Sequence, residues 1–251
     1  MALDPAFLAR PIAHRALHDL TARRPENSRG AVRAAIAAGY GIEIDLQMSA
    51  DGRAIVFHDY ALDRLTGEAG PVRGRSAAQL GQIPLLSGDE GIPTFAEILD
   101  ITAGKVPLLV EIKDQDGALG PNVGELEAAA AADAAGYNGP LAFMSFNPHA
   151  MIALGRIAPD FVRGLTTCSF TAEHWPTVPS SMRDRLVGIP DLEETGAAFI
   201  SHRARDLASP HVARIKATGL PVLCWTVRSA AAEAEARRIA DNVTFEGYTA
   251  A

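Results

Sequence analysis

Two pairs of charged residues interrupt apolar runs at alternating positions. Glu43 and Asp45 are separated by one isoleucine in the run GIEIDL, and Glu111 and Lys113 by another in LLVEIK. Residues two apart on a strand face the same side, so each pair shares one face and its apolar neighbours the other. A buried charge is costly unless it is paired or bound to a cation. Either set of two residues alone could also be solvated at a strand edge or form a buried ion pair. Two such pairs together favour a functional site.

The chemistry of these side chains indicates what they would bind. Glu43, Asp45 and Glu111 are oxygen donors, and no thiolate accompanies them. Such a set suits a hard cation, Mg²⁺ or Ca²⁺, better than zinc. We therefore expect the three carboxylates to bind a divalent cation, and Lys113 to lie beside an anionic substrate.

Two of the seven histidines stand at the ends of predicted strands. His14 precedes Arg15, and His58 precedes Asp59. A single histidine more often has a structural role, but barrel enzymes place their active sites at the carboxyl ends of the strands. Their shared position makes both histidines candidates for acid–base catalysis.

Alternating strand and helix patterns must position these groups. Apolar runs rich in β-branched residues predict strands at 11–15, 41–47, 54–59, 107–113, 141–147 and 221–228, with weaker candidates at 161–167, 196–202 and 242–246. Alanine-rich stretches with helical spacing end in glycine at 28–39, 94–104, 124–136 and 209–219. This alternation predicts an α/β protein with a parallel sheet.

Nine strand candidates exceed the eight of a closed barrel. The link at 47–53 is too short for a crossover helix and contains the turn signal Asp51-Gly52, so we expect the irregularity there. Residues 60–92 are rich in glycine and have few periodic apolar positions. They predict a loop-rich insertion that is placed to cover a site.

Length and composition exclude several classes of protein. A chain of 251 residues with 48% hydrophobic content predicts one domain, 1–251, with a large core. The net charge of -7 without a basic stripe argues against nucleic acid as a partner. Cys168 and Cys224 have no C-x-x-C spacing, so we expect neither a disulfide framework nor a thiolate zinc site. We find no export signal and no apolar run of membrane-spanning length, and we expect a cytoplasmic protein without stable membrane association.

An ordered series of motifs runs through the chain. It comprises HR at 14–15, RPENS at 24–28, EID at 43–45, DG at 51–52, VFHD at 56–59, LDRLTG at 62–67, IPTFAEIL at 92–99, VEIK at 110–113, SF at 145–146 and CWTV at 224–227. The series resembles the signature of glycerophosphodiester phosphodiesterases, a family of phosphatidylinositol-phospholipase-C-like barrels, over nearly the whole chain.

The resemblance implies a (β/α)₈ TIM barrel with a small loop-rich insertion after the third strand, at about 60–92. It also implies roles: metal ligation by Glu43, Asp45 and Glu111, acid–base catalysis by His14 and His58, and phosphate binding by Arg15 and Lys113. Two further residues have alternative interpretations. Trp225 is either a wall for the substrate or part of the core, and Glu26 is either a helix-start residue or a polar residue of the site.

Three positions depart from the family pattern. Ala16 follows the His-Arg pair where the family usually has glycine, and its methyl group is expected near the phosphate site. The closing segment lacks the usual Thr-Asp-aromatic-Pro sequence, so we assign no role to Glu246. Arg228 replaces an asparagine, and it either touches an anionic substrate or lies at the barrel rim.

The function implied is metal-dependent hydrolysis of glycerophosphodiesters to glycerol phosphate and an alcohol such as choline or ethanolamine. One alternative is a lysophospholipase D or sphingomyelinase D activity on lipids, which would call for an apolar rim or an interfacial helix. Residues 60–92 show no apolar cluster, so we favour a water-soluble small-molecule substrate. Another alternative is a catalytically silent barrel that binds phosphate compounds. The sequence does not distinguish a monomer from an oligomer.

Overall fold

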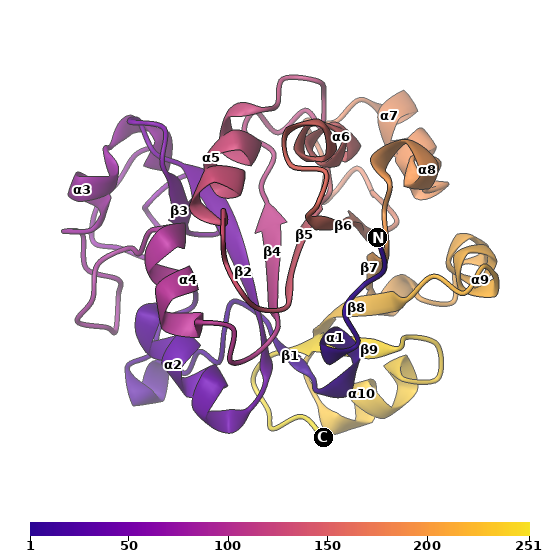
Figure 1. The fold of residues 1–251 in the computed structure, drawn as a ribbon, viewed down its shortest axis with the longest axis horizontal. Helices are drawn as coiled ribbons and strands as arrows, with labels where there is room; N and C mark the ends of the chain where they lie inside the picture. The colour runs from indigo at the N-terminus through magenta and orange to yellow at the C-terminus, as the bar shows by residue number, and fades with distance from the viewer.

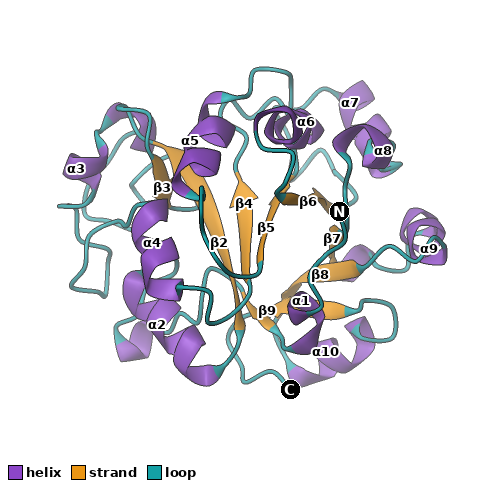
Figure 2. Ribbon diagram, in the orientation of Figure 1, coloured by secondary structure: helices purple, strands orange, loops and turns teal.

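The computed structural model describes residues 1–251 as a closed barrel of eight parallel strands with helices around the outside (Figures 1 and 2). Each barrel strand pairs with its neighbours, and β1 closes the ring by pairing with both β2 and β9. The barrel strands are β1 (Ile12–Ala13), β2 (Gly41–Met48), β4 (Leu108–Ile112), β5 (Leu141–Ser145), β6 (Val162–Thr167), β7 (Ile200–Arg203), β8 (Val222–Val227) and β9 (Asn242–Phe245). The predicted TIM-barrel fold is confirmed.

The ninth candidate strand is not part of the barrel. β3 (Ala54–Val56) pairs antiparallel with β2, with Leu46 opposite Val56. The tight link between them contains Gly52, whose φ of 73° suits glycine because a Cβ disfavours the left-handed region. The expected irregularity therefore lies where the turn signal placed it. It is a hairpin attached to the second barrel strand.

Helices cover the outside of the barrel. They are α1 (Ala6–Ala9), α2 (Arg29–Ala38), α3 (Ala77–Leu80), α4 (Phe95–Thr102), α5 (Glu125–Asp133), α6 (Pro148–Ile157), α7 (Ser180–Val187), α8 (Leu192–Thr195), α9 (Pro210–Ala217) and α10 (Ala230–Ala236), with 3₁₀ turns at Leu20–Ala22, Val72–Gly74 and Ala204–Asp206. The four predicted helices are α2, α4, α5 and α9. Each of these four helices lies between two strands in the sequence, as the predicted alternation of strands and helices required. No helix combines the length and apolar content needed to cross a membrane.

Local sequence explains where these helices start and stop. Ser28 accepts a hydrogen bond from the Ala31 backbone N–H and so begins α2, and Gly39, with φ of 72°, ends it. Thr94 forms a capping box with Glu97 at the start of α4. These caps satisfy terminal backbone groups that the helix itself leaves unpaired.

The interior of the barrel has an apolar floor. Ile12, Leu109, Phe199 and Leu223 belong to one buried cluster there, which also includes Phe7 of α1. Gly164 provides the space, because a Cβ at this position would lie 2.4 Å from the Phe199 ring. The floor closes the barrel at the amino-terminal ends of its strands.

Polar side chains fill the interior above that floor. Glu111 lies two residues after Leu109 on β4 and therefore faces the same way, one layer higher. Residues 42, 44 and 46 of β2 face outward into the main core of 40 buried residues, which leaves Glu43 and Asp45 facing inward. The charged residues therefore lie at the end of the barrel opposite the apolar floor.

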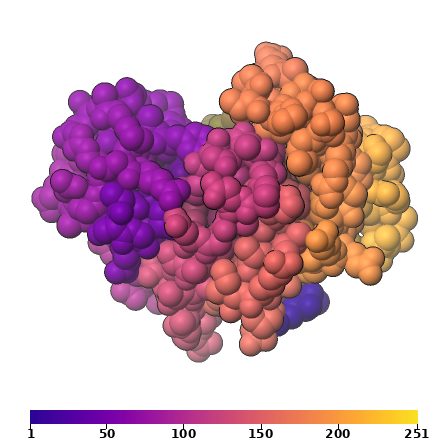
Figure 3. Space-filling view, turned by 90° about the horizontal axis from the view of Figure 1, so that it is seen from above, coloured from indigo at the N-terminus to yellow at the C-terminus, as the bar shows by residue number.

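Residues 60–92 contain a small core of their own. Leu62, Leu80 and Ile92 are buried, and they pack in a cluster with Ile55 and Phe57 next to β3. The apolar residues of this insertion are therefore used internally. In Figure 3 the purple segment that carries α3 and the orange segment that carries α7 stand on either side of an indentation in the outline of the molecule.

Candidate active site

A cavity of about 330 Å³ lies in the polar end of the barrel. Every site residue expected from the sequence lines it. The residues that line this cavity include His14, Arg15, Glu43, Asp45, His58, Glu111, Lys113, Phe146, Thr166, Arg203, Arg205, Trp225, Arg228 and Thr244. Residues that are far apart in the sequence thus meet in one place.

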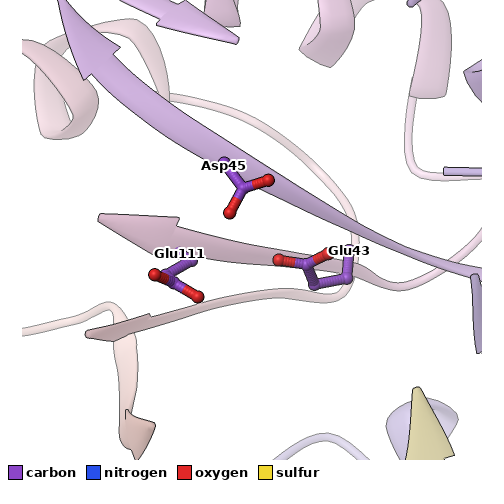
Figure 4. Close-up of side chains that lie close together, drawn as sticks. All are labelled: Glu43, Asp45 and Glu111. Atoms are coloured by element: carbon purple, nitrogen blue, oxygen red, sulfur yellow. The ribbon is translucent and has the colours of Figure 1, made fainter. Parts of the chain in front are cut away.

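Three carboxylates converge at the base of this cavity. Glu43 and Asp45 project from β2 and Glu111 from the adjacent β4, and Figure 4 shows them turned toward one another. One oxygen from each lies within 4.8 Å of the others, and all three residues are buried. Burial, together with the negative charges of Asp45 and Glu111, raises the pKa of Glu43 well above its usual range. Repulsion of this kind is relieved by a cation.

Lys113 supplies one positive charge to this cluster. Its Nζ lies 2.8 Å from Asp45 Oδ1 and 2.6 Å from Glu111 Oε1. Burial by itself would raise the pKa of Asp45. The positive charge of Lys113 outweighs it together with other nearby groups, and it is the largest of the effects that hold this pKa below its usual range. Two positive charges, from Lys113 and Arg15, face three carboxylates, so the residues present fit a divalent cation.

Arg15 is held by carboxylates on both sides. Its Nη1 lies 2.7 Å from Glu26 Oε1, and its Nε lies 3.7 Å from Asp45 Oδ2. Its backbone N–H donates to Glu43 Oε2 at 2.8 Å. Of the two interpretations of Glu26, the contacts favour the polar site residue, because Ser28 and not Glu26 caps α2.

Asn27 orients one of the carboxylates. Its Nδ2 donates to Asp45 Oδ2 at 2.9 Å, and both residues are buried. No role in the site was predicted for Asn27 from the sequence. The contact could not be predicted from the RPENS motif. It depends on the backbone conformation of Asn27, whose φ is 57°, and on the direction of its side chain.

His14 is hydrogen-bonded to a residue to which the sequence assigned no role. His14 Nδ1 and Glu246 Oε2 are 2.6 Å apart. Ala13 of β1 is in register with Phe245 of β9, so the next residue of each strand meets across the closing seam of the barrel. Because a carboxylate only accepts, the proton of this bond lies on Nδ1, which leaves Nε2 of neutral His14 as an acceptor. Burial lowers the pKa of His14, although the Glu246 hydrogen bond opposes that shift.

His58 has a similar carboxylate partner but reaches the site by a different route. His58 Nδ1 lies 2.6 Å from Asp59 Oδ1. His58 follows a strand, as predicted, but that strand, β3, is not one of the barrel strands. β3 runs back along β2, and Phe57 donates its backbone N–H to the Asp45 carbonyl, so the hairpin delivers His58 beside Asp45.

A salt-bridge network joins the surroundings of Arg15 and His58. Arg64 donates to Glu26 at 2.8 and 3.0 Å and to Asp59 at 2.6 and 3.0 Å. Glu26 in turn binds Arg15, and Asp59 binds His58. Arg64 comes from the insertion, so this segment supports the site as well as flanking it.

The departures from the family pattern have structural explanations. Ala16 has φ of 64°, a region that favours glycine, but its methyl group is buried in the main core and does not line the cavity. The expectation that this methyl group lies near the phosphate site is therefore wrong. Arg228 lines the cavity and donates its Nε to Glu246 Oε1 at 2.7 Å.

Several polar groups of the cavity were not identified from the sequence. The hydroxyl groups of Thr166 and Thr244 are buried and have no hydrogen-bond partner. Arg203 and Arg205, from the end of β7 and the turn after it, line the cavity without forming an ion pair with any carboxylate. Their position just beyond a weak strand candidate was the only available signal.

A second cavity, about 630 Å³ in volume, adjoins the first. Both are lined by His58, Phe146 and Trp225. The second also has Leu119, Cys168 and Trp175 in its wall, from loops that follow β4 and β6. From the sequence we expected no apolar rim at the site, because only residues 60–92 were considered for one. The apolar lining of this second cavity shows that this expectation was wrong.

Comparison with known proteins gives the family. The family model of the glycerophosphoryl diester phosphodiesterases matches residues 14–244. A glycerophosphodiester phosphodiesterase of Caldanaerobacter subterraneus subsp. tengcongensis is 28% identical over 159 residues, which cover 60% of this chain and 65% of that protein. The match thus spans just under two thirds of that relative's length.

Solved structures show a similar architecture. An Oleispira antarctica phosphodiesterase, solved in complex with the product sn-glycerol-3-phosphate, has a TM-score of 0.76 and 26% identity, with 96% of this chain and 94% of that chain covered. A glycerophosphodiester phosphodiesterase from Thermotoga maritima, at 21% identity and a TM-score of 0.69, covers 94% of both chains and shows the same fold. From the family match over most of its length, this chain belongs to the glycerophosphoryl diester phosphodiesterase family.

Proposed function

We propose that this chain hydrolyses glycerophosphodiesters to glycerol phosphate and an alcohol, with a divalent cation, Mg²⁺ or Ca²⁺, bound by Glu43, Asp45 and Glu111. The observation that carries the proposal is the buried three-carboxylate cluster in a cavity that also contains two histidines and several cationic side chains. The sn-glycerol-3-phosphate in the Oleispira antarctica phosphodiesterase supports the choice of substrate.

The cation and the basic side chains would have complementary tasks. A divalent ion at the carboxylates would stabilise the negative charge that develops on the phosphoryl oxygens. Arg15 lines the cavity beside the cluster and would bind a phosphoryl oxygen. Lys113, which contacts Asp45 and Glu111, would turn its ammonium group toward the substrate phosphate. Both residues keep the roles that the family resemblance implied.

The histidines would transfer the protons. His14 has an acceptor Nε2 and a pKa that burial lowers, so it is suited to deprotonate the attacking hydroxyl or water. His58 lines both cavities, whereas His14 lines only the first, so His58 is the better placed to protonate a departing alkoxide. We therefore assign His14 as the base and His58 as the acid.

Other side chains would orient the glycerol arm. The free hydroxyl groups of Thr166 and Thr244 line the first cavity, where a polyol offers matching donors and acceptors. Trp225 lies at the boundary of the two cavities and donates its Nε1–H to the Ser201 carbonyl at 3.0 Å. This bond would hold the indole in place as a wall for the substrate.

The test is hydrolysis of glycerophosphodiesters followed by phosphorus NMR. Purified protein with Mg²⁺ or Ca²⁺ is expected to release glycerol phosphate, and chelation is expected to stop the reaction. Glu111→Gln serves as the site variant, and Glu125→Gln, an exposed acid on α5, as its matched control. Full turnover after exhaustive chelation would refute the metal assignment, and no turnover with any ion would refute the activity.

A further inference from the structure

The second cavity is an apolar pocket that opens directly onto the catalytic cavity. Its volume of about 630 Å³ is within the range of small-molecule sites. His58, Glu111 and Lys113 line its inner end, which is shared with the first cavity. A substrate held at the carboxylates would therefore extend one arm into this pocket without any rearrangement.

Aromatic rings form the wall of this pocket. The ring of Phe146 packs edge-on against Trp225 at a centroid distance of 5.4 Å and tilted against Trp175 at 4.8 Å. Leu119 and Cys168 are buried beside them in one cluster. Trp175 is only partly buried, which leaves apolar surface that a ligand can cover. Leu119, Cys168 and Trp175 come from loops 114–124 and 168–179, and Tyr60 and Ala61 line the pocket at the start of the insertion.

The charges at the pocket argue against a cationic occupant. Lys113 and Arg203 line it, and Arg203 has only His174 as a side-chain partner, at 3.2 Å. The acidic residues are already engaged. Asp59 accepts from His58 and Arg64, and Asp114 accepts from Asn147 and from a backbone N–H. A quaternary ammonium group would lie near the Arg203 guanidinium, which forms no ion pair with a carboxylate, so aromatic rings alone do not make this a choline site.

We propose that the pocket binds an aliphatic chain on the alcohol arm of the diester, so that the protein's substrates are glycerophosphodiesters whose departing alcohol is apolar. This inference rests on the proposed function. The glycerol phosphate would occupy the polar cavity with its free threonine hydroxyls, and the alcohol would lie beyond His58, the residue that protonates it. The apolar surface of the aliphatic chain and of Trp175 would be removed from water together.

Steady-state kinetics on a series of sn-glycero-3-phosphoalkanols, from methyl to octyl and below their micelle concentrations, tests this directly. kcat/KM is expected to rise about three- to fourfold for each added methylene until the pocket is filled. The 3,3-dimethylbutyl diester is the neutral counterpart of glycerophosphocholine and has the same shape. It is expected to be the better substrate of the two.

Variants test whether the aromatic wall causes the dependence of kcat/KM on chain length. Trp175→Ala is expected to flatten the dependence on chain length, and Trp175→Phe to retain part of it. Leu86→Ala removes an apolar side chain that is 50% exposed outside the pocket, and it is expected to leave the dependence unchanged. The proposal would be overturned if kcat/KM depended on chain length equally in the wild type and in Trp175→Ala. A preference for glycerophosphocholine over its neutral counterpart would overturn it as well.

Binding measurements separate this inference from the proposed function. Calorimetry with alkyl phosphonates, which are not hydrolysed, is expected to show the same dependence on chain length. Chain-dependent binding without hydrolysis of any diester would refute the activity and keep the pocket. Hydrolysis that is independent of chain length would keep the activity and refute the pocket. Cleavage of a lysophospholipid, together with a flat alkanol series, would place the aliphatic chain on the glycerol arm and overturn our placement.

Discussion

His14 Nδ1 and Glu246 Oε2 are 2.6 Å apart, although 232 positions separate the two residues in the sequence. The contact crosses the seam where β1 meets β9, so barrel closure itself completes this pair. Glu246 is also bound to Arg228. Burial opposes charge on Glu246, but the hydrogen bond from His14 and the nearby Arg228 hold its pKa below the usual range. A carboxylate fixed in this way sets the tautomer and orientation of the proposed base.

Glu246→Ala is expected to lower kcat, but by less than the loss of about 10²- to 10⁴-fold expected for His14→Ala. The reason is that the imidazole stays in place but loses the group that orients it. Steady-state kinetics on one diester measures both, and Glu235→Ala, an exposed acid on α10, is the control. Equal losses in the Glu246 and His14 variants would argue for a direct role of Glu246 in proton transfer.

Glu43→Gln is expected to abolish turnover and to stabilise the metal-free protein by about 0.5–2 kcal/mol. Burial and the neighbouring carboxylates raise the pKa of Glu43 in the folded state, so its contribution to stability declines as the pH rises above the ordinary glutamate pKa of 4.5. The gain should therefore appear at neutral pH and vanish below pH 4.5. Thermal unfolding in chelator at two pH values measures it. A variant less stable than wild type at neutral pH would contradict the repulsion argument.

The assignment of His14 as the base and His58 as the acid can be tested by changing the leaving group of the substrate. A nitrophenyl phosphodiester releases an alcohol of low pKa that needs little protonation, so it is expected to rescue His58→Ala and not His14→Ala. Metal binding by both variants, measured by calorimetry, should be unchanged. Selective rescue of His14→Ala would reverse the assignment, and near-normal rates of both variants on an alkyl diester would exclude both histidines from the mechanism.

The pH profile of kcat/KM is expected to be bell-shaped. Burial, the largest effect, lowers the pKa of His14 from 6.5, so the acidic limb should lie below pH 6.5. Below that limb His14 is protonated and cannot act as the base. His14→Ala should remove the limb from its residual activity. A limb that persists unchanged in this variant would assign it to another group.

Arg64→Ala is expected to lower kcat by up to about 10²-fold, because displacement of reacting groups by small distances has effects of this size. Arg64 holds both Glu26 and Asp59 and so positions Arg15 and His58 without touching the carboxylate cluster. Arg73→Ala, which breaks an exposed ion pair between the same insertion and Glu125 of α5, is the control and should retain full activity. A change in KM alone would limit Arg64 to substrate binding.

The sequence by itself determined the elements and the residues on their inward faces. Strand periodicity is a local property, so the alternation of charged and apolar residues was enough to place Glu43, Asp45 and Glu111 on the inward faces of their strands. The glycine-containing turn after β2 likewise predicted the extra hairpin. Strand-end positions identified His14 and His58, spacing identified Lys113 and the motif series added Arg15, and the fold brings all of them into one cavity.

Only the tertiary structure decided the contacts that depend on closure and on loops. The partnership of His14 with Glu246 needs β1 and β9 to meet, and the position of His58 needs β3 to run antiparallel to β2. The aromatic pocket joins Phe146, just after β5, and Trp225 of β8 with Trp175 from a loop, and no local pattern shows that these three side chains meet. Local patterns specify which face a side chain takes, but long-range pairing specifies its neighbours, and that information is spread over the whole chain.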